Sequence, residues 1–107
     1  MELSDYRARI DQIDRQLVEL FAPRMNTAAG IAAYKKEHGL PVLDPVRERE
    51  KLLDVAAQAP EDMRDYTASL YTMLFELSRC YQGRLLGSTS PLTTEIQTAI
   101  DQTPNLF

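Results

Sequence analysis

The stretch from Tyr6 to Lys36 limits the possible folds more than any other part of this 107-residue chain. Its apolar residues recur at steps of three and four, a spacing that collects side chains on one face of a helix. These residues are Ile10, Ile13, Leu17, Leu20, Phe21, Ala28 and Ile31. The spacing predicts one long helix, which would be roughly 45 Å long at the usual rise per residue.

Pro23 stands inside this predicted helix, where a proline removes one backbone hydrogen bond and costs about 3 kcal/mol. Because the apolar spacing resumes after it without turn residues, we expect a kink beside Arg24 and not a break. The alternative is that the helix ends there and a second one follows. Ser4 or Asp5 is the expected N-cap, and Gly39 is expected to end the helix.

Two cations interrupt the apolar face of this helix. Arg24 follows Leu20 by four residues, and Lys35 follows Ile31 by four, so both should point toward the side that is buried. Burying an unpaired charge costs several kcal/mol, so both cations need an anionic partner. They would lie roughly 16 Å apart on nearly the same face. This gap suits a compact ligand with more than one anionic group.

Arg7 lies on the same predicted helix but about 25 Å from Arg24, too far to reach the same small molecule. If Arg7 serves a site, that site should be in another subunit. A symmetric homodimer is expected for a second reason. A compact chain of this length has a radius of gyration near 13 Å, about a third of the helix length, so one chain cannot cover the apolar face.

The composition excludes several classes of function. The net charge of −4 argues against nucleic-acid binding. One cysteine and one histidine give neither a disulfide framework nor a transition-metal site. No signal peptide or membrane-length apolar run is visible, so a cytoplasmic protein without membrane contact is expected.

A second helix is expected from Asp44, as N-cap, and Pro45, at the first helical position, to about Gln58. Its charged block, residues 47–51, has the composition of an exposed helix face. Arg47 and Glu48 lie in the first turn, however, beside the loop that follows Lys35, and there they could line a pocket.

A third helix is expected from about Met63 to Leu86, with apolar residues on two sides, and it should be largely buried. Ser78 and Gln82 lie four residues apart on an apolar face, so both need hydrogen-bond partners. Interhelical hydrogen bonds are the alternative to a role in a site. The expected domains are a helical domain at 1–87 and a polar tail or linker at 88–107.

This ordered set of residues resembles the all-helical (AroQ-type) chorismate mutase family over residues 3–86. The resemblance includes the opening pattern Arg7-x-x-Ile10-x-x-Ile13-Asp14. It implies an all-α fold in which two three-helix chains, each with one long N-terminal helix, form an intertwined homodimer. In that family, each of two equivalent sites is completed by an arginine from the other chain, which is the role left open for Arg7.

The resemblance also implies a role for each residue. Arg24 and Arg7 of the partner subunit would bind the two substrate carboxylates, and Lys35 and Gln82 would lie on either side of the ether oxygen of the breaking bond. The remaining contacts would be made by Glu48 and the backbone near Asp44 to the ring hydroxyl, and by Arg47 and Ser78 in support of the carboxylate contacts. Pro23 departs from the uninterrupted helix that is usual there.

The implied activity is the rearrangement of chorismate to prephenate in phenylalanine and tyrosine biosynthesis, without cofactor or metal. The tail from Ser88 resembles the joint before a prephenate dehydratase domain in bifunctional relatives, so a C-terminal domain of that kind is expected in a longer chain. Two alternatives stay open. One is an isochorismate pyruvate lyase of the same fold, and the other is a non-catalytic helical dimer or small-molecule sensor, which leaves Arg24 and Lys35 unexplained.

Overall fold

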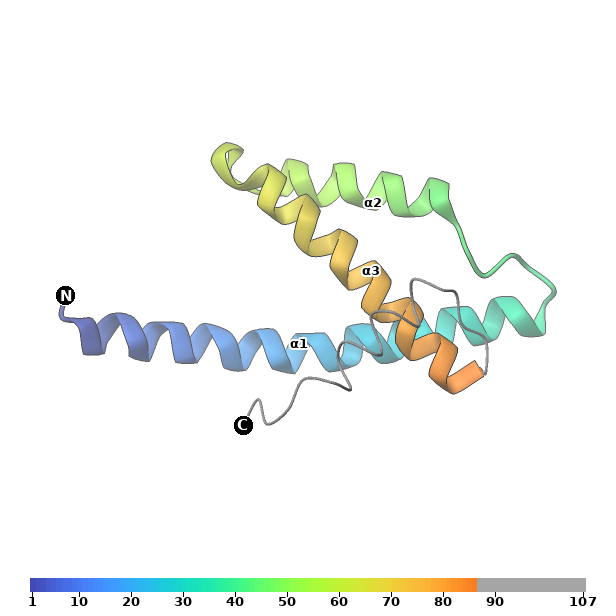
Figure 1. Ribbon diagram of the computed structural model, residues 1–107, viewed down its shortest axis with the longest axis horizontal. Coiled ribbons are helices and arrows are strands. Elements are labelled where there is room, and N and C mark those ends of the chain that lie inside the picture. Colours follow the sequence, from blue (N-terminus) through green and yellow to red (C-terminus); the bar gives the residue numbers. More distant parts are fainter. Residues whose placement is uncertain (87–107) are drawn as a thin grey trace.

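The computed structural model describes residues 1–86, which form three α-helices joined by short connections (Figure 1). In chain order these are α1 (Leu3–Glu37), α2 (Pro45–Gln58) and α3 (Arg64–Leu86), with a 3-10 turn η1 (Glu61–Met63) before α3. The predicted all-α, three-helix chain with one long N-terminal helix is confirmed. The predicted tail at 88–107 lies outside the described residues.

The first helix begins earlier than the sequence suggested. Glu2 is the N-cap, and its backbone N–H donates to the Asp5 carboxylate at 2.9 Å in a capping box. The prediction of Ser4 or Asp5 as the N-cap was therefore wrong. Asp5 is instead the N3 residue, and its carboxylate accepts the backbone N–H of the N-cap Glu2. At the other end Gly39, with φ of 67°, follows the C-cap His38 and stops the helix as predicted.

α1 continues through Pro23 as one helix, so the alternative of two separate helices is wrong. The expected kink is not visible in Figure 1. Pro23 is exposed, and water can therefore hydrogen-bond to the Glu19 carbonyl group that loses its helical donor. The continuous helix keeps Arg7 on the same rigid element as Arg24 and Lys35.

The predicted start of α2 is confirmed, with Asp44 as N-cap and Pro45 as the first helical residue. The Asp44 carboxylate accepts the backbone N–H of Arg47 at 3.0 Å. This bond satisfies one of the four N–H groups that a helix start leaves without a partner.

α3 packs against both other helices and crosses the C-terminal half of α1, whereas the N-terminal half of α1 projects away from them (Figure 1). Small side chains lie where the helices meet: Ala32 of α1 is 2% exposed, and Ser78 and Cys80 of α3 are each 5% exposed. Small residues let helix backbones approach closely, so this crossing fixes the position of α3 on α1.

Much of the apolar face of α1 is uncovered in the single chain. Ile10, Leu17 and Leu20 expose 56%, 57% and 69% of their surface. α3 is also less buried than predicted, since Tyr66 and Leu70 on its N-terminal half are exposed. The radius of gyration is 16.4 Å, above the value of about 13 Å for a compact chain of this length. None of the described helices is both long and apolar enough to cross a membrane.

The tight crossing at Ala32 gives a test of this packing. We expect Ala32→Leu to lower the free energy of unfolding by about 1–3 kcal/mol, because added methyl groups have no room at a buried contact. Ala33→Leu, at the exposed neighbouring position, should change it by less than about 0.5 kcal/mol. Urea denaturation of the variants at equal protein concentration measures both effects. Equal losses in both variants would show that the crossing is not tightly packed.

Candidate active site

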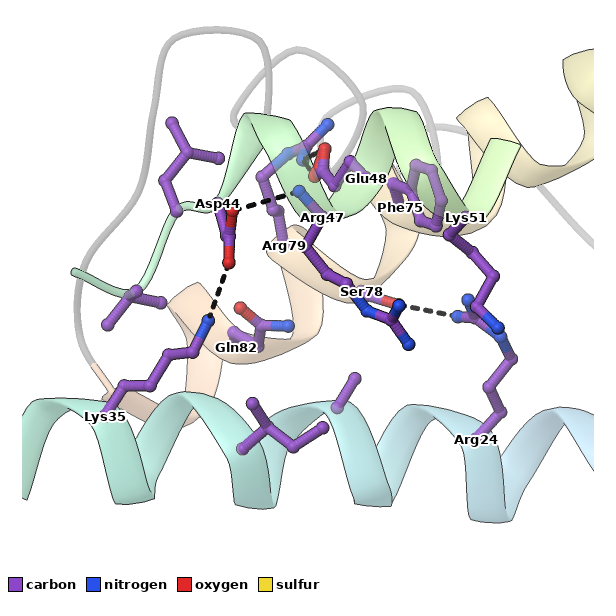
Figure 2. A pocket seen from close by; sticks show the side chains of 14 residues that line it. Arg24, Lys35, Asp44, Arg47, Glu48, Lys51, Phe75, Ser78, Arg79 and Gln82 are labelled. Carbon is purple, nitrogen blue, oxygen red and sulfur yellow. Dashed lines mark hydrogen bonds and ion pairs between the residues drawn. The ribbon is translucent and has the colours of Figure 1, made fainter. Parts of the chain in front are cut away.

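One pocket of about 290 Å³ lies between the three helices and is lined by all of them (Figure 2). Its volume is near the lower end of the range for small-molecule sites, about 300–1,000 Å³. The lining residues are Arg24, Ala28, Ile31 and Lys35 of α1, Val42, Leu43 and Asp44 of the connecting loop, Arg47, Glu48 and Lys51 of α2, and Phe75, Ser78, Arg79 and Gln82 of α3.

The structure brings together seven of the eight site residues predicted from the sequence. The pocket includes Arg24, Lys35, Asp44, Arg47, Glu48, Ser78 and Gln82. The eighth, Arg7, is exposed on the projecting half of α1 and does not line this pocket. This separation agrees with the distance estimated from the helical rise.

Arg24 is held by a hydroxyl group and two aromatic rings. Its Nη1 donates to the Ser78 hydroxyl at 3.4 Å, and its guanidinium lies 5.5 Å from the ring centre of Tyr71 and 5.8 Å from that of Phe75. Aromatic faces stabilise a cation without neutralising it. Within residues 1–86, no carboxylate lies at ion-pair distance from Arg24. The partner expected for this cation is thus an anion from outside the described chain.

Ser78 is held by two contacts to α1. Its hydroxyl accepts from Arg24 and lies 3.6 Å from the sulfur of Met25. The interhelical contacts considered for Ser78 in the sequence are therefore present. The bond from Arg24 also orients the Arg24 side chain at the pocket wall, and a role of Ser78 in substrate binding stays a prediction.

Lys35 lies at the opposite end of the pocket from Arg24, as Figure 2 shows. Its Nζ is 3.9 Å from the Asp44 carboxylate, the same group that caps α2. Asp44 thus connects the end of α1 to the start of α2. An ammonium group has three donors, so this single long ion pair leaves Lys35 able to donate into the pocket.

Gln82 extends from α3 into the pocket on the side of Lys35 (Figure 2). It is half-buried, and its amide makes no hydrogen bond to any residue among 1–86. The interhelical hydrogen bond considered as an alternative is therefore wrong for the described chain. A half-buried amide with free donors is available to a ligand.

Two charged residues of the pocket were missed by the sequence analysis. Arg79 of α3 donates to both carboxylate oxygens of Glu48, one of them at 2.6 Å. Lys51 of α2 forms an ion pair with Asp54, with 3.6 Å between Nζ and the carboxylate oxygen. The charged block of α2 is thus only partly an exposed face, because Glu48 and Lys51 are half-buried. Glu48 and Lys51 are three residues apart and so share a face of α2. This spacing could have indicated that Lys51 lines the pocket together with Glu48.

The charges of the lining side chains favour an anionic ligand. Five cations, Arg24, Lys35, Arg47, Lys51 and Arg79, face two carboxylates, Asp44 and Glu48, which leaves an excess of three positive charges. A partly enclosed site with one sign of charge concentrates ions of the other sign. Among residues 1–86, no group of three or more His, Cys, Asp or Glu side chains is placed to hold a metal ion.

The helices and the pocket define an all-helical protein with a cationic pocket between its helices. The chain belongs to the chorismate mutase type II family, whose sequence model matches residues 6–83.

Three curated relatives are similar to parts of the chain. A protein named T-protein from Haemophilus influenzae is 44% identical over 46 residues, which are 43% of this chain and 12% of the relative. A chorismate mutase from Methanocaldococcus jannaschii is 38% identical over 48 residues, 45% of this chain and 48% of the relative. A T-protein from Enterobacter agglomerans is 37% identical over 51 residues, 48% of this chain and 14% of the relative. The chain therefore spans less than half the length of each of these relatives. No solved structure matches it.

Proposed function

We propose that this protein is a chorismate mutase that rearranges chorismate to prephenate in phenylalanine and tyrosine biosynthesis. The observation that carries the proposal is Arg24, a half-buried cation without a carboxylate partner among residues 1–86, facing a pocket with excess positive charge. Chorismate is a compact dianion, so its carboxylates would supply the missing partners. The family of the chain and its chorismate mutase relative support the same substrate.

The chemistry of this reaction fits the residue types around the pocket. The rearrangement is intramolecular: one carbon–oxygen bond breaks while one carbon–carbon bond forms. A protein accelerates such a step by holding the substrate in its compact reactive conformer and by directing donors at the oxygen on which negative charge develops. We assign these donors to Lys35 and Gln82, a cation and a neutral amide on different helices.

The other lining residues would hold the rest of the substrate. We assign Arg24 to one carboxylate, with support from Ser78 and Arg47, because Ser78 already orients the Arg24 guanidinium. Glu48 and the backbone near Asp44 would hold the ring hydroxyl. This arrangement leaves the second substrate carboxylate without a dedicated arginine in one chain.

We infer that Arg7 of the partner subunit fills this gap in an intertwined homodimer. The support is the exposed apolar face of α1 and the position of Arg7, which adjoins that face one turn before Ile10. Covering the apolar face would stabilise the dimer, and the same contact would bring Arg7 to another pocket. A cytoplasmic location and a C-terminal prephenate dehydratase domain in a longer chain stay predictions.

The activity is tested directly by incubating the purified protein with chorismate and measuring the loss of chorismate absorbance over time. We expect Lys35→Ala to lower kcat/KM by roughly 100-fold or more, because one donor to the developing charge is lost. The folding stability should fall by only about 1 kcal/mol or less, since the Lys35–Asp44 pair is long and partly exposed. Lys35→Arg should rescue little, because a planar fork does not replace a point donor.

Three other outcomes, from this assay and from the same assay with isochorismate, have clear meanings. Full activity of Lys35→Arg would contradict the assigned ether contact. Turnover of isochorismate to pyruvate without turnover of chorismate would support the lyase of the same fold, and turnover of neither would support a non-catalytic protein.

Sites shared between subunits make a second prediction. Arg7→Ala and Arg24→Ala should each be inactive, but a mixed dimer of the two assembles one site in which both arginines are intact. Free exchange of equal amounts should therefore restore about a quarter of the parent activity. Sedimentation equilibrium should show a dimer at micromolar concentration, and exchange is followed with a tagged chain. A stable folded monomer, or no recovery after verified exchange, would contradict the shared site.

Gln82 gives a prediction that depends on pH. An amide donates at any ordinary pH, whereas a glutamate of the same length donates only when protonated, and its carboxylate repels negative charge on the ether oxygen. Gln82→Glu should therefore be weakly active at neutral pH and recover as the pH falls toward the pKa of the new carboxyl group, which is about 4.3 when unperturbed and higher when desolvated.

The measurement is kcat/KM against pH for the parent and the variant, with circular dichroism at each pH as the control for folding. If Gln82→Glu keeps the pH profile of the parent, Gln82 does not face the reacting bond.

A further inference from the structure

Arg79 lies between two carboxylates from different helices. Its Nη1 donates to both oxygens of Glu48 on α2, and its Nη2 donates to Glu76, three residues earlier on α3. The three side chains are 26%, 29% and 15% exposed for Arg79, Glu48 and Glu76. Figure 2 shows the Arg79–Glu48 pair at the α2 wall of the pocket.

Both terminal nitrogens of Arg79 are engaged by these carboxylates, so neither is the natural partner of a substrate carboxylate. Glu48 is different. A carboxylate offers about four acceptor positions, and the bonds from Arg79 occupy two of them. Glu48 therefore keeps the capacity to accept a hydrogen bond from a neutral donor, such as a hydroxyl group.

The ion pair also changes what Glu48 does to a dianionic ligand. An unpaired carboxylate in this pocket would repel the ligand, and it would be free to turn toward Lys51 or Arg47, which line the same cavity. A bound guanidinium offsets its charge and fixes its direction, because charge-assisted hydrogen bonds are short and directional.

We propose that Arg79 is a positioning residue that holds Glu48 as an acceptor for the ring hydroxyl and thereby makes the site selective for a hydroxylated substrate. This inference rests on the proposed function. Glu76 fixes Arg79 from the other side, which leaves the guanidinium little freedom to rotate away from Glu48.

The test compares binding of two bicyclic diacids that mimic the rearranging ring system, one with the ring hydroxyl and one without it, measured by calorimetry on the full chain. We expect Arg79→Met to weaken binding of the hydroxylated diacid by about tenfold, the usual effect of a lost charge-assisted contact. Binding of the diacid without the hydroxyl should weaken by a clearly smaller factor, because it loses only the guanidinium that offsets the Glu48 charge and makes no hydrogen bond to Glu48. Arg49→Met is the matched control, since Arg49 is exposed on α2 and does not line the pocket.

Arg79→Met also removes the partner of Glu76, whose other carboxylate oxygen is buried without a hydrogen bond among the described residues. The same measurement is therefore made on the double variant Glu76→Gln/Arg79→Met, in which no buried carboxylate is left unpaired on α3. Glu48→Gln should reduce the preference for the hydroxyl, and adding Arg79→Met to it should reduce the preference little further.

Equal weakening of both diacids, or no change in either, would overturn the positioning role and leave Arg79 as a link between α2 and α3. So would a parent that binds the two diacids equally. The proposed function is judged separately, since turnover of chorismate by the parent is measured without these ligands and stands or fails on its own.

Discussion

The continuity of α1 is the constraint on which the rest of the structure depends. Arg24 and Lys35 are eleven residues apart on one helix, which places them roughly 16 Å apart along its axis. A break at Pro23 would have made the direction of the projecting half, which carries Arg7, independent of the half that carries Arg24 and Lys35. Because residues 24–35 form one rigid stretch of α1, α2 and α3 need only close the space between two fixed cations, and the small residues Ala32, Ser78 and Cys80 let α3 lie close enough to do so.

The cations that line the pocket are stabilised in two different ways. Lys35 is paired with Asp44, and Arg79 with Glu48, so that two of the five lining cations have a carboxylate inside the pocket. Arg24 is instead held by a hydroxyl group and two aromatic rings, which fix its direction but leave its charge available. Desolvating a charge without a partner is costly, and this cost is recovered only when an anion binds. In the proposed function, the affinity for an anion is therefore concentrated at the Arg24 end of the pocket.

Features set by local chemistry could be predicted from the sequence, whereas those set by helix packing could not. Asp44 and Pro45 specify a helix start through their own backbone preferences, and Gly39 specifies a helix end in the same way. The inward direction of Arg24 and Lys35 followed from helical spacing alone. Arg79 was missed because its partner Glu48 is on another helix, and the contact between them depends on how α2 packs beside α3. Glu2 was missed as N-cap because Asp5 can serve as a cap or, as it does here, as the N3 member of a capping box.

Two features of the projecting half of α1, its uncovered apolar face and the position of Arg7, would both be explained by pairing with a second copy of the chain. Its apolar face is uncovered, and Arg7 lies beside that face without a contact to the pocket about 25 Å away. A helix that only had to support the pocket could begin near Arg24, since α3 crosses α1 in its C-terminal half. The additional turns extend α1 well beyond its own chain, where a second copy could bury the apolar residues. If the copies pair in this way, the binding of two substrate carboxylates is divided between chains, and the pocket of one monomer holds only half of the cations that a dianion requires in this proposal.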